Sequence, residues 1–284
     1  MRSCLGLSTW AVPVRTQGHR QVTYWRYWQL SGAPFSGSFF RGSTIDEALA
    51  RIEFLVSNRR ALGSLIGASG VGKSRLLQYC AANPPIGAEI PSLQMFRTSL
   101  LGMPPGELLS DLAGRLAGQR RVQDATAAWS LICDYFQAAR REGTQTVLLV
   151  DDSESATAAA EADLTRLLSM TFPLTVIIAV ETRLASAVSR AIVDRCELQI
   201  DLPAWDIMQS AEFLAWMSIS LGRTTPVFTD LAVERIQELS QGVARRIVQL
   251  TDLALVAGAV AQADCIDADC IEQVANELPK STAA

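Results

Sequence analysis

Short runs of aliphatic residues alternate with amphipathic stretches over the first two thirds of the chain. Most of the runs are apolar at successive positions, which is typical of strands buried on both faces of a parallel sheet, and the stretches between them have helical spacing. This alternation predicts a three-layer α/β domain with a parallel sheet. The expected strands are 62–66, 92–98, 146–152, 173–180 and 196–202, the last with the alternating character of an edge strand.

Helices are expected between these strands. Thr44-Ile45-Asp46-Glu47 fits a capping box, with Thr first and Glu three positions later. It predicts that Thr44 caps a helix that runs to about Asn58 and packs on the sheet. The other expected helices begin at about 75 and 104, or span 124–140 and 158–170.

From Trp205 onward the apolar spacing is helical, and no strand pattern interrupts it. Four expected helices, at 206–221, 229–240, 244–261 and 268–278, predict a small all-α domain, which we call the lid domain. We therefore expect a disordered tail over residues 1–22, the α/β domain over 23–203, and the lid domain over 204–284.

Residues 23–30 hold four large aromatic rings, those of Tyr24, Trp25, Tyr27 and Trp28. We call this stretch the aromatic segment. So many rings rarely stay in water, so we expect the segment to pack onto the α/β domain. The alternative is that the rings, interleaved with Arg26, stack on nucleic-acid bases.

The main chemical motif joins the strand at 62–66 to the helix that follows it. Residues 67–74 fit G-x-x-x-x-G-K-[ST], whose glycines let successive backbone N–H groups point at a phosphate in front of a helix N-terminus. The alternative is a glycine-rich turn that fits by chance. The motif predicts a P-loop NTPase core in which the nucleotide is bound by Gly67, Ala68, Ser69, Gly70, Val71, Gly72, Lys73, Ser74 and Arg75.

Within this loop, Lys73 is expected to reach the β- and γ-phosphates and Ser74 to be a ligand of Mg²⁺. The chain has 25 basic residues, yet only Lys73 and Lys280 are lysines. A chain that otherwise uses arginine therefore keeps a compact ammonium group in the loop, where that shape suits a phosphate site.

The strand expected at 146–152 ends in two carboxylates, Asp151 and Asp152. Ligands of open α/β sheets bind at the carboxyl ends of the strands, so Asp151 is expected to hold Mg²⁺ through water and Asp152 to polarise the attacking water. The alternative is that the two acids only cap the next helix. The strand at 173–180 is followed by Glu181 and Thr182, either of which is a candidate sensor of the γ-phosphate.

Composition narrows the possible partners and cofactors. The formal charge of −4 argues against binding nucleic acid through the whole surface. The first 45 residues carry five arginines and no acid, so this segment is the only candidate for a phosphate or lipid contact, with a solvated tail as the alternative. One histidine and six cysteines without C-x-x-C spacing give no pattern for a His/Cys metal site. No apolar run reaches the roughly 20 residues that span a bilayer, and we expect a cytoplasmic protein.

With these motifs in hand, the chain resembles the AAA+ ATPases, in particular the branch of ExeA/GspA-type secretion ATPases and TniB/TnsC-type transposition regulators. The resemblance spans about Tyr24 to Leu278. It is carried by Tyr27-Trp28-Gln29-Leu30, Ala33-Pro34-Phe35, the phosphate loop, 147–152, 176–184 and Gly242-Val243-Ala244-Arg245.

The resemblance implies ATP and Mg²⁺ as cofactors, and a homo-oligomer that hydrolyses ATP at its subunit interfaces. It implies that Arg245 extends from the lid domain to the nucleotide, with Arg246 as the alternative. Arg195, and after it Arg190, is the candidate for an arginine that acts on the neighbouring subunit's nucleotide. An ordinary surface ion pair is an equally good interpretation of either.

Three positions depart from the pattern of the branch. Ala244 replaces a proline, Asp152 replaces the more frequent Glu, which suggests slower hydrolysis, and Glu181 replaces a neutral amide. The first functional hypothesis is an accessory ATPase of secretion or envelope assembly, with a membrane partner supplying the anchor. The others are a DNA-associated regulator and a nucleotide-dependent scaffold with little hydrolysis.

Overall fold

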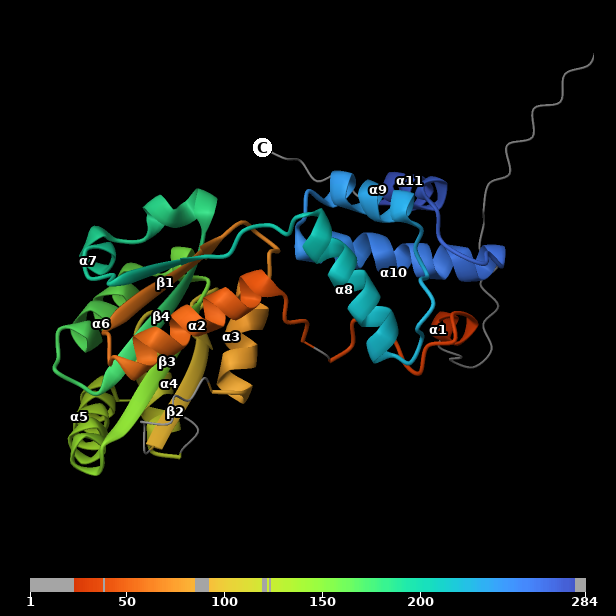
Figure 1. Ribbon diagram of the computed structural model, residues 1–284. Coiled ribbons are helices and arrows are strands. Elements are labelled where there is room, and N and C mark those ends of the chain that lie inside the picture. Colours follow the sequence, from red (N-terminus) through yellow and green to blue (C-terminus); the bar gives the residue numbers. More distant parts are fainter. Residues whose placement is uncertain (1–22, 38, 85–91, 119–121, 123, 279–284) are drawn as a thin grey trace, which may run out of the picture.

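The computed structural model describes residues 23–37, 39–84, 92–118, 122 and 124–278. Its sheet has the strand order β2-β3-β4-β1-β5, and all four pairings between neighbouring strands are parallel. The predicted fold class, a parallel α/β domain followed by a helical part, is therefore confirmed (Figure 1). The strands are β1 (Leu62–Gly67), β2 (Ser92–Ser99), β3 (Thr144–Asp151), β4 (Leu174–Glu181) and β5 (Leu198–Asp201).

The two faces of the sheet carry separate hydrophobic clusters because side chains alternate along each strand. On β3, Val147 and Leu149 pack with helices α2 (Ser43–Ser57) and α3 (Lys73–Ala82). Leu148 and Val150 point to the other face. That face is covered by α4 (Glu107–Leu116), α5 (Ala125–Glu142), α6 (Ala158–Leu168) and α7 (Arg190–Val193).

The predicted capping box at the start of α2 is not formed. The helix begins two residues earlier than expected, and its N-cap is Gly42, which has no side chain to cap it. The side-chain amide of Gln209 donates hydrogen bonds to the hydroxyls of Ser43 and Thr44 instead. Glu47 pairs with Arg51 one turn later. A partner from another part of the chain thus takes the Thr44 hydroxyl that the local pattern assigned to the helix end.

The helical part consists of α8 (Ile207–Ser220), α9 (Asp230–Ser240), α10 (Ala244–Ala261) and α11 (Ala268–Glu277). Three of these helices start at a side-chain cap: Asp206, Thr229 and Asp267 each accept a hydrogen bond from the backbone N–H three residues on. The four helices lie where the sequence pattern predicts them. No helix within the described ranges is long and apolar enough to cross a membrane.

The aromatic segment packs on the helical part, so the expectation that it packs onto the α/β domain is wrong. Its short helix α1 (Tyr24–Tyr27) contacts α10, and the Tyr24 hydroxyl donates to the carboxylate of Asp252. Trp28 is 1% exposed and donates its indole N–H to the Leu255 carbonyl at 2.7 Å. Gly258 makes room for this ring, since a Cβ there would lie 2.7 Å from the indole. The buried Trp28 ring is not free to stack on a base.

The tail expected over residues 1–22 lies outside the described residues, as do the arginines at its positions 2, 15 and 20. Two stretches of chain connect the α/β and helical parts, one before α2 and one after β5 (Figure 1). The carboxyl ends of the strands therefore lie next to the junction of the two parts.

Candidate nucleotide site

The phosphate loop connects β1 to α3, as predicted. Gly70 and Gly72 have φ angles of 81° and 111°, a region that side-chain-bearing residues rarely adopt. At Gly67 the constraint is space, because a Cβ would lie 2.5 Å from the carbonyl oxygen of Leu202. The path of the chain thus requires each of the three glycines of the motif, and the loop lies between a strand and a helix as the phosphate-loop interpretation predicts.

Lys73 stands at the first position of α3 and lies in the middle of the site. Its Nζ donates to the carbonyl oxygens of Gly67 at 2.7 Å and Ala68 at 3.0 Å. Partial burial lowers the pKa of Lys73, while the carboxylates of Glu154, Glu181 and Asp151 act in the opposite direction. An ammonium that is partly removed from water gains from any further anion, and a phosphate is such a group.

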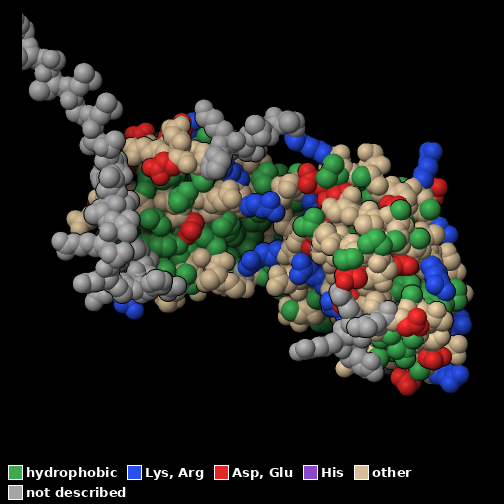
Figure 2. All heavy atoms as spheres, turned by 180° about the vertical axis from the view of Figure 1, so that it is seen from behind, with side chains coloured by type: hydrophobic (Ala, Val, Ile, Leu, Met, Phe, Trp, Pro, Cys, Tyr) green, Lys and Arg blue, Asp and Glu red, His purple; other side chains and the backbone are tan. Residues whose placement is uncertain are grey.

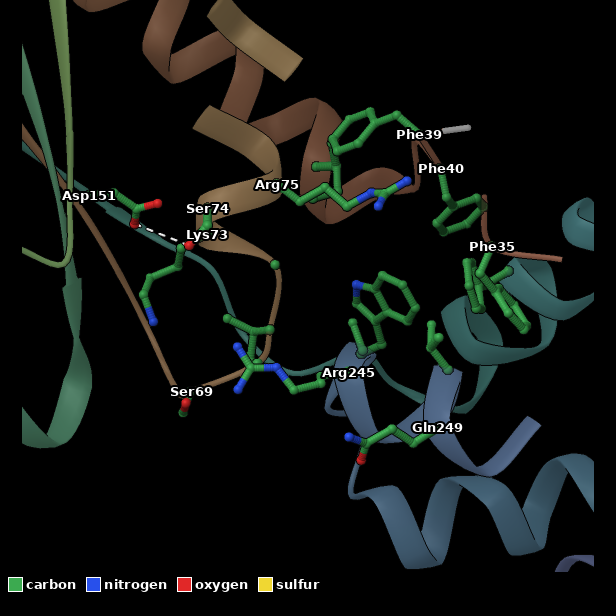
Figure 3. A pocket seen from close by; sticks show the side chains of 18 of the residues that line it. Phe35, Phe39, Phe40, Ser69, Lys73, Ser74, Arg75, Asp151, Arg245 and Gln249 are labelled. Atoms are coloured by element: carbon green, nitrogen blue, oxygen red, sulfur yellow. Dashed lines mark hydrogen bonds between the residues drawn. The ribbon is translucent and has the colours of Figure 1, made fainter. Parts of the chain in front are cut away.

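The two residues predicted to hold Mg²⁺, Ser74 and Asp151, are in contact with each other. Asp151 is 2% exposed at the end of β3, and the Ser74 hydroxyl donates to its Oδ1 at 3.1 Å (Figure 3). Within the described ranges no three acidic, histidine or cysteine residues form a metal-binding group. One hydroxyl and one buried carboxylate side by side still fit Mg²⁺, which takes few protein ligands and the rest from phosphates and water.

Asp152 follows the strand in a left-handed conformation with a φ of 52°, and it lines the cavity. Its Oδ2 accepts a hydrogen bond of 2.6 Å from the hydroxyl of Ser99, at the end of β2. The alternative role as a helix cap is wrong for Asp152, because its side chain makes no capping bond to the 3₁₀ helix η1 (Ser153–Ser155). Ser99 was not predicted, since its contact depends on β2 pairing with β3.

A further carboxylate, that of Glu154, also lines the cavity. Its Oε2 accepts from the backbone N–H of Glu181 at 3.3 Å. Glu181 ends β4 opposite Gly67 of the phosphate loop and lines the cavity as well. Thr182 begins the exposed 3₁₀ helix η2 (Thr182–Ala187) and is not among the lining residues. Of the two candidate sensors, Glu181 therefore lines the cavity and Thr182 does not, and the sensor role stays a prediction.

Arg245 brings the helical part to the phosphate loop. Its backbone N–H donates to the Gly70 carbonyl at 3.0 Å, and its side chain lines the cavity beside Ser69 (Figure 3). Arg246, the alternative, is not among the lining residues. Arg75 lines the cavity between the loop and the aromatic side chains.

Arg195 lies at the surface, outside the cavity lining. One guanidinium nitrogen donates to the Ala191 carbonyl at 2.7 Å and the other to the Ser169 hydroxyl at 3.4 Å. Arg190, at the start of α7, is also exposed. Neither arginine contributes to the site of its own chain.

The cavity between the two parts has a volume of about 440 Å³. Figure 2 shows hydrophobic side chains beside basic ones where the parts meet. Opposite the phosphate loop, the wall is aromatic; Phe40, for example, lies 5.6 Å from Trp205 and 5.4 Å from Trp216, between ring centroids. Such rings offer flat apolar faces that suit a nucleotide base. The wall consists of Phe35, Phe39, Phe40, Trp205, Phe213 and Trp216.

Comparison with known proteins agrees with this geometry. Residues 56–188 match the AAA domain family. Among curated proteins, no sequence matches the chain. The fold is similar to that of the RuvB Holliday junction branch migration motor of Thermotoga maritima, with a TM-score of 0.57 and 18% identity over 84% of this chain and 70% of that one. It is also similar to that of the Aeropyrum pernix ORC2 protein in its ADPNP–ADP complexes, with a TM-score of 0.63 and 18% identity over 89% and 71%.

The phosphate loop, the acidic end of β3 and the matching AAA domain together define a P-loop ATPase of the AAA+ type. The AAA domain match begins at the end of α2 and ends just after η2, so it contains every strand of the sheet except β5.

Proposed function

We propose that this protein binds ATP with Mg²⁺ in the cavity between its α/β and helical parts, hydrolyses it, and uses the change to move the helical part as a lid, in the cytoplasm. One observation carries the proposal: Ser74 and Asp151 are in contact in the same cavity that Arg245 lines from α10. This arrangement supports a single site at which triphosphate, metal and lid would meet.

In the proposed reaction, the backbone N–H groups of the phosphate loop and the N-terminus of α3 hold the phosphates. Lys73 exchanges its bonds to the loop carbonyls for phosphate oxygens, which accept a charge-assisted hydrogen bond. Ser74 and Asp151 would hold Mg²⁺, which would supply positive charge against the phosphates.

Asp152 orients and polarises the attacking water, and Ser99 fixes one of its carboxylate oxygens. Asp is one methylene shorter than Glu, so the carboxylate lies further from the phosphate and slow turnover is expected. Glu181 is the proposed sensor; as a carboxylate near phosphates it opposes ATP binding and favours release of the products. The aromatic wall receives the base.

The contact of Arg245 with Gly70 supports the proposed movement of the lid. A change in the loop on hydrolysis alters this hydrogen bond and the position of the guanidinium group, and α10 transmits the change to the helical part. Arg195 is proposed to act on the nucleotide of a neighbouring copy in a homo-oligomer, as the resemblance to AAA+ ATPases implies. Its exposure and its absence from the cavity of its own chain support this role.

The last part of the proposal is the biological pathway in which this ATPase acts. The sequence resemblance supports an accessory of secretion or envelope assembly of the ExeA/GspA type. The likeness to a branch migration motor supports a DNA-associated regulator as the second candidate. ATP-dependent DNA binding that weakens steeply with salt would favour the second candidate, and its absence the first.

Phosphate release by purified protein tests the proposed reaction. We expect wild-type protein to release phosphate from ATP, and Asp152→Asn to bind ATP with unchanged affinity while losing at least about a hundredfold in turnover. Asp134→Asn, at an exposed position of α5, is the matched control and should behave as wild type. Saturable ATP binding without phosphate release from wild-type protein would instead identify a scaffold.

A further inference from the structure

The side chain of Arg97 contacts the carboxylate of Asp151, which is proposed to hold Mg²⁺. Arg97 lies on β2, which pairs with β3, and its Nη2 is 3.2 Å from Oδ2 of Asp151. The Arg97 side chain is 35% exposed and that of Asp151 only 3%. Arg97 is outside the lining of the nucleotide cavity, so it acts on the site through Asp151.

The two oxygens of Asp151 are divided between partners. Oδ1 accepts from the Ser74 hydroxyl at 3.1 Å and from the backbone N–H of Asp152 at 3.2 Å. Oδ2 is held by Arg97. Each oxygen of the carboxylate therefore already has a donor, and among the described residues the charged donor is the guanidinium group of Arg97.

A carboxylate as deeply buried as that of Asp151 is unfavourable unless a positive charge balances it. Arg97 supplies this charge although its own Nε is buried without a hydrogen-bond partner among the described residues. Packing alone does not explain why an arginine occupies a position where one of its N–H groups lacks a hydrogen-bond partner among the described residues. The pairing with Asp151 accounts for it.

The backbone of Arg97 is also held in place. Arg115 of α4 donates from Nη1 to the Arg97 carbonyl at 3.1 Å, and from Nε to Asp111 at 2.9 Å. These contacts fix the strand that carries the guanidinium group, so that Arg97 is directed at Asp151.

We propose that Arg97 is the built-in counter-ion of Asp151 and that it competes with Mg²⁺ for this carboxylate, thereby setting how strongly Mg²⁺ favours nucleotide binding. This inference rests on the proposed function of the same site. Two positive groups that share one carboxylate repel each other, so Arg97 lowers the advantage that Mg²⁺ gives to ATP. It also keeps Asp151 neutralised when no metal ion is bound. Arg97 is a positioning residue and does not touch the nucleotide.

The test compares the dissociation constants for ATP measured by calorimetry in EDTA and in Mg²⁺. The ratio of the constant in EDTA to the constant in Mg²⁺ should rise about three- to tenfold in Arg97→Met, because removal of the positive charge strengthens the attraction of Asp151 for Mg²⁺. Arg97→Lys keeps the charge and should stay within about twofold of wild type. Arg60→Met is the matched control, since Arg60 pairs with Glu197 at 3.1 Å outside the cavity.

A second readout needs no nucleotide. Millimolar Mg²⁺ should raise the melting temperature of Arg97→Met more than that of wild type or Arg60→Met, because only that variant of the three lacks the cation in direct contact with Asp151. Arg97→Gln, which keeps a hydrogen-bond donor, replaces Arg97→Met if the latter does not fold. An unchanged or lower ratio together with an unchanged response to Mg²⁺ would overturn the proposal. Failure of wild-type protein to bind ATP would count against the proposed function, and the melting experiment would still decide the role of Arg97.

Discussion

The backbone N–H of Arg245 lies 3.0 Å from the carbonyl oxygen of Gly70, so the first turn of α10 is hydrogen-bonded to the phosphate loop. The approach is so close that a Cβ on Gly70 would lie 3.0 Å from the Cβ of Arg245 and 3.0 Å from Cγ1 of Val243. At this point the loop and the helical part are in direct contact. In the proposed function, this contact couples the nucleotide to the helical part.

Substitution of Arg245 tests whether its side chain contributes to nucleotide binding. Arg245→Ala keeps the backbone bond to Gly70 and removes the guanidinium group, so the fold should be retained. We expect ATP affinity to fall about tenfold, since a hydrogen bond to a charged group contributes about 1.5 kcal/mol. Arg246→Ala is the control and should change the dissociation constant less than about twofold. Equal losses in both variants would show that neither arginine is specific to the site.

Substitution of the acidic residues near Lys73 should have the opposite effect and strengthen ATP binding. Glu154 and Glu181 line the cavity and act on the charge of Lys73. Glu154→Gln and Glu181→Gln remove negative charge from the phosphate end, so each should tighten ATP binding about threefold or more, with a larger effect at low salt. Glu161→Gln, whose carboxylate accepts from the Ser189 N–H outside the cavity, is the matched control. Weaker binding in the first two variants would contradict this electrostatic interpretation.

Gly242 fixes the chain between α9 and α10. It has a φ of 73°, and a Cβ there would lie 1.9 Å from the carbonyl oxygen of Trp205. Gly242→Ala should lower stability by about 2 kcal/mol or more, a fall in melting temperature of roughly 5 °C. Gly222, with a φ of 88° and no atom within 4 Å of the added Cβ, provides the comparison. Gly222→Ala should cost only about 1 kcal/mol, from backbone strain alone.

Asp163 on α6 predicts a pH dependence of stability. Burial raises its pKa above the ordinary 3.8, with Arg166 acting against the rise, and its Oδ2 is buried without a partner among the described residues. The folded protein thus holds this proton more firmly than the unfolded chain, so stability is lost as the pH rises from 3.8 through the folded pKa.

Asp163→Asn should therefore raise the melting temperature at neutral pH by a few degrees, and the gain should vanish below the ordinary pKa of the carboxyl group. Asp134→Asn, at an exposed position, is the control for the substitution itself. A gain that is the same at both pH values would indicate that the charge of Asp163 is not its cause.

The parts of the structure that the sequence predicted are those with local causes. The glycines and Lys73 of the loop follow one strand directly, and Asp151 ends another, so the position of both follows from the order of a parallel sheet.

The features that were missed depend on segments far apart in the chain. Thr44 lost its capping role because Gln209 of α8 takes its hydroxyl. Trp28 packs on α10 because Gly258, 230 positions later, leaves space for its ring. Arg97 and Ser99 reach the acids of β3 only through the pairing of β2 with β3, and a sequence pattern does not specify which strands pair.

The central claim is that ATP binds at the phosphate loop, and Lys73 tests it most directly. Lys73→Ala should reduce ATP affinity at least about a hundredfold with no loss of folded structure, as measured by calorimetry and circular dichroism. Lys280→Ala, at the only other lysine of the chain, should bind like wild type. Unchanged ATP affinity in a folded Lys73→Ala protein would contradict the account.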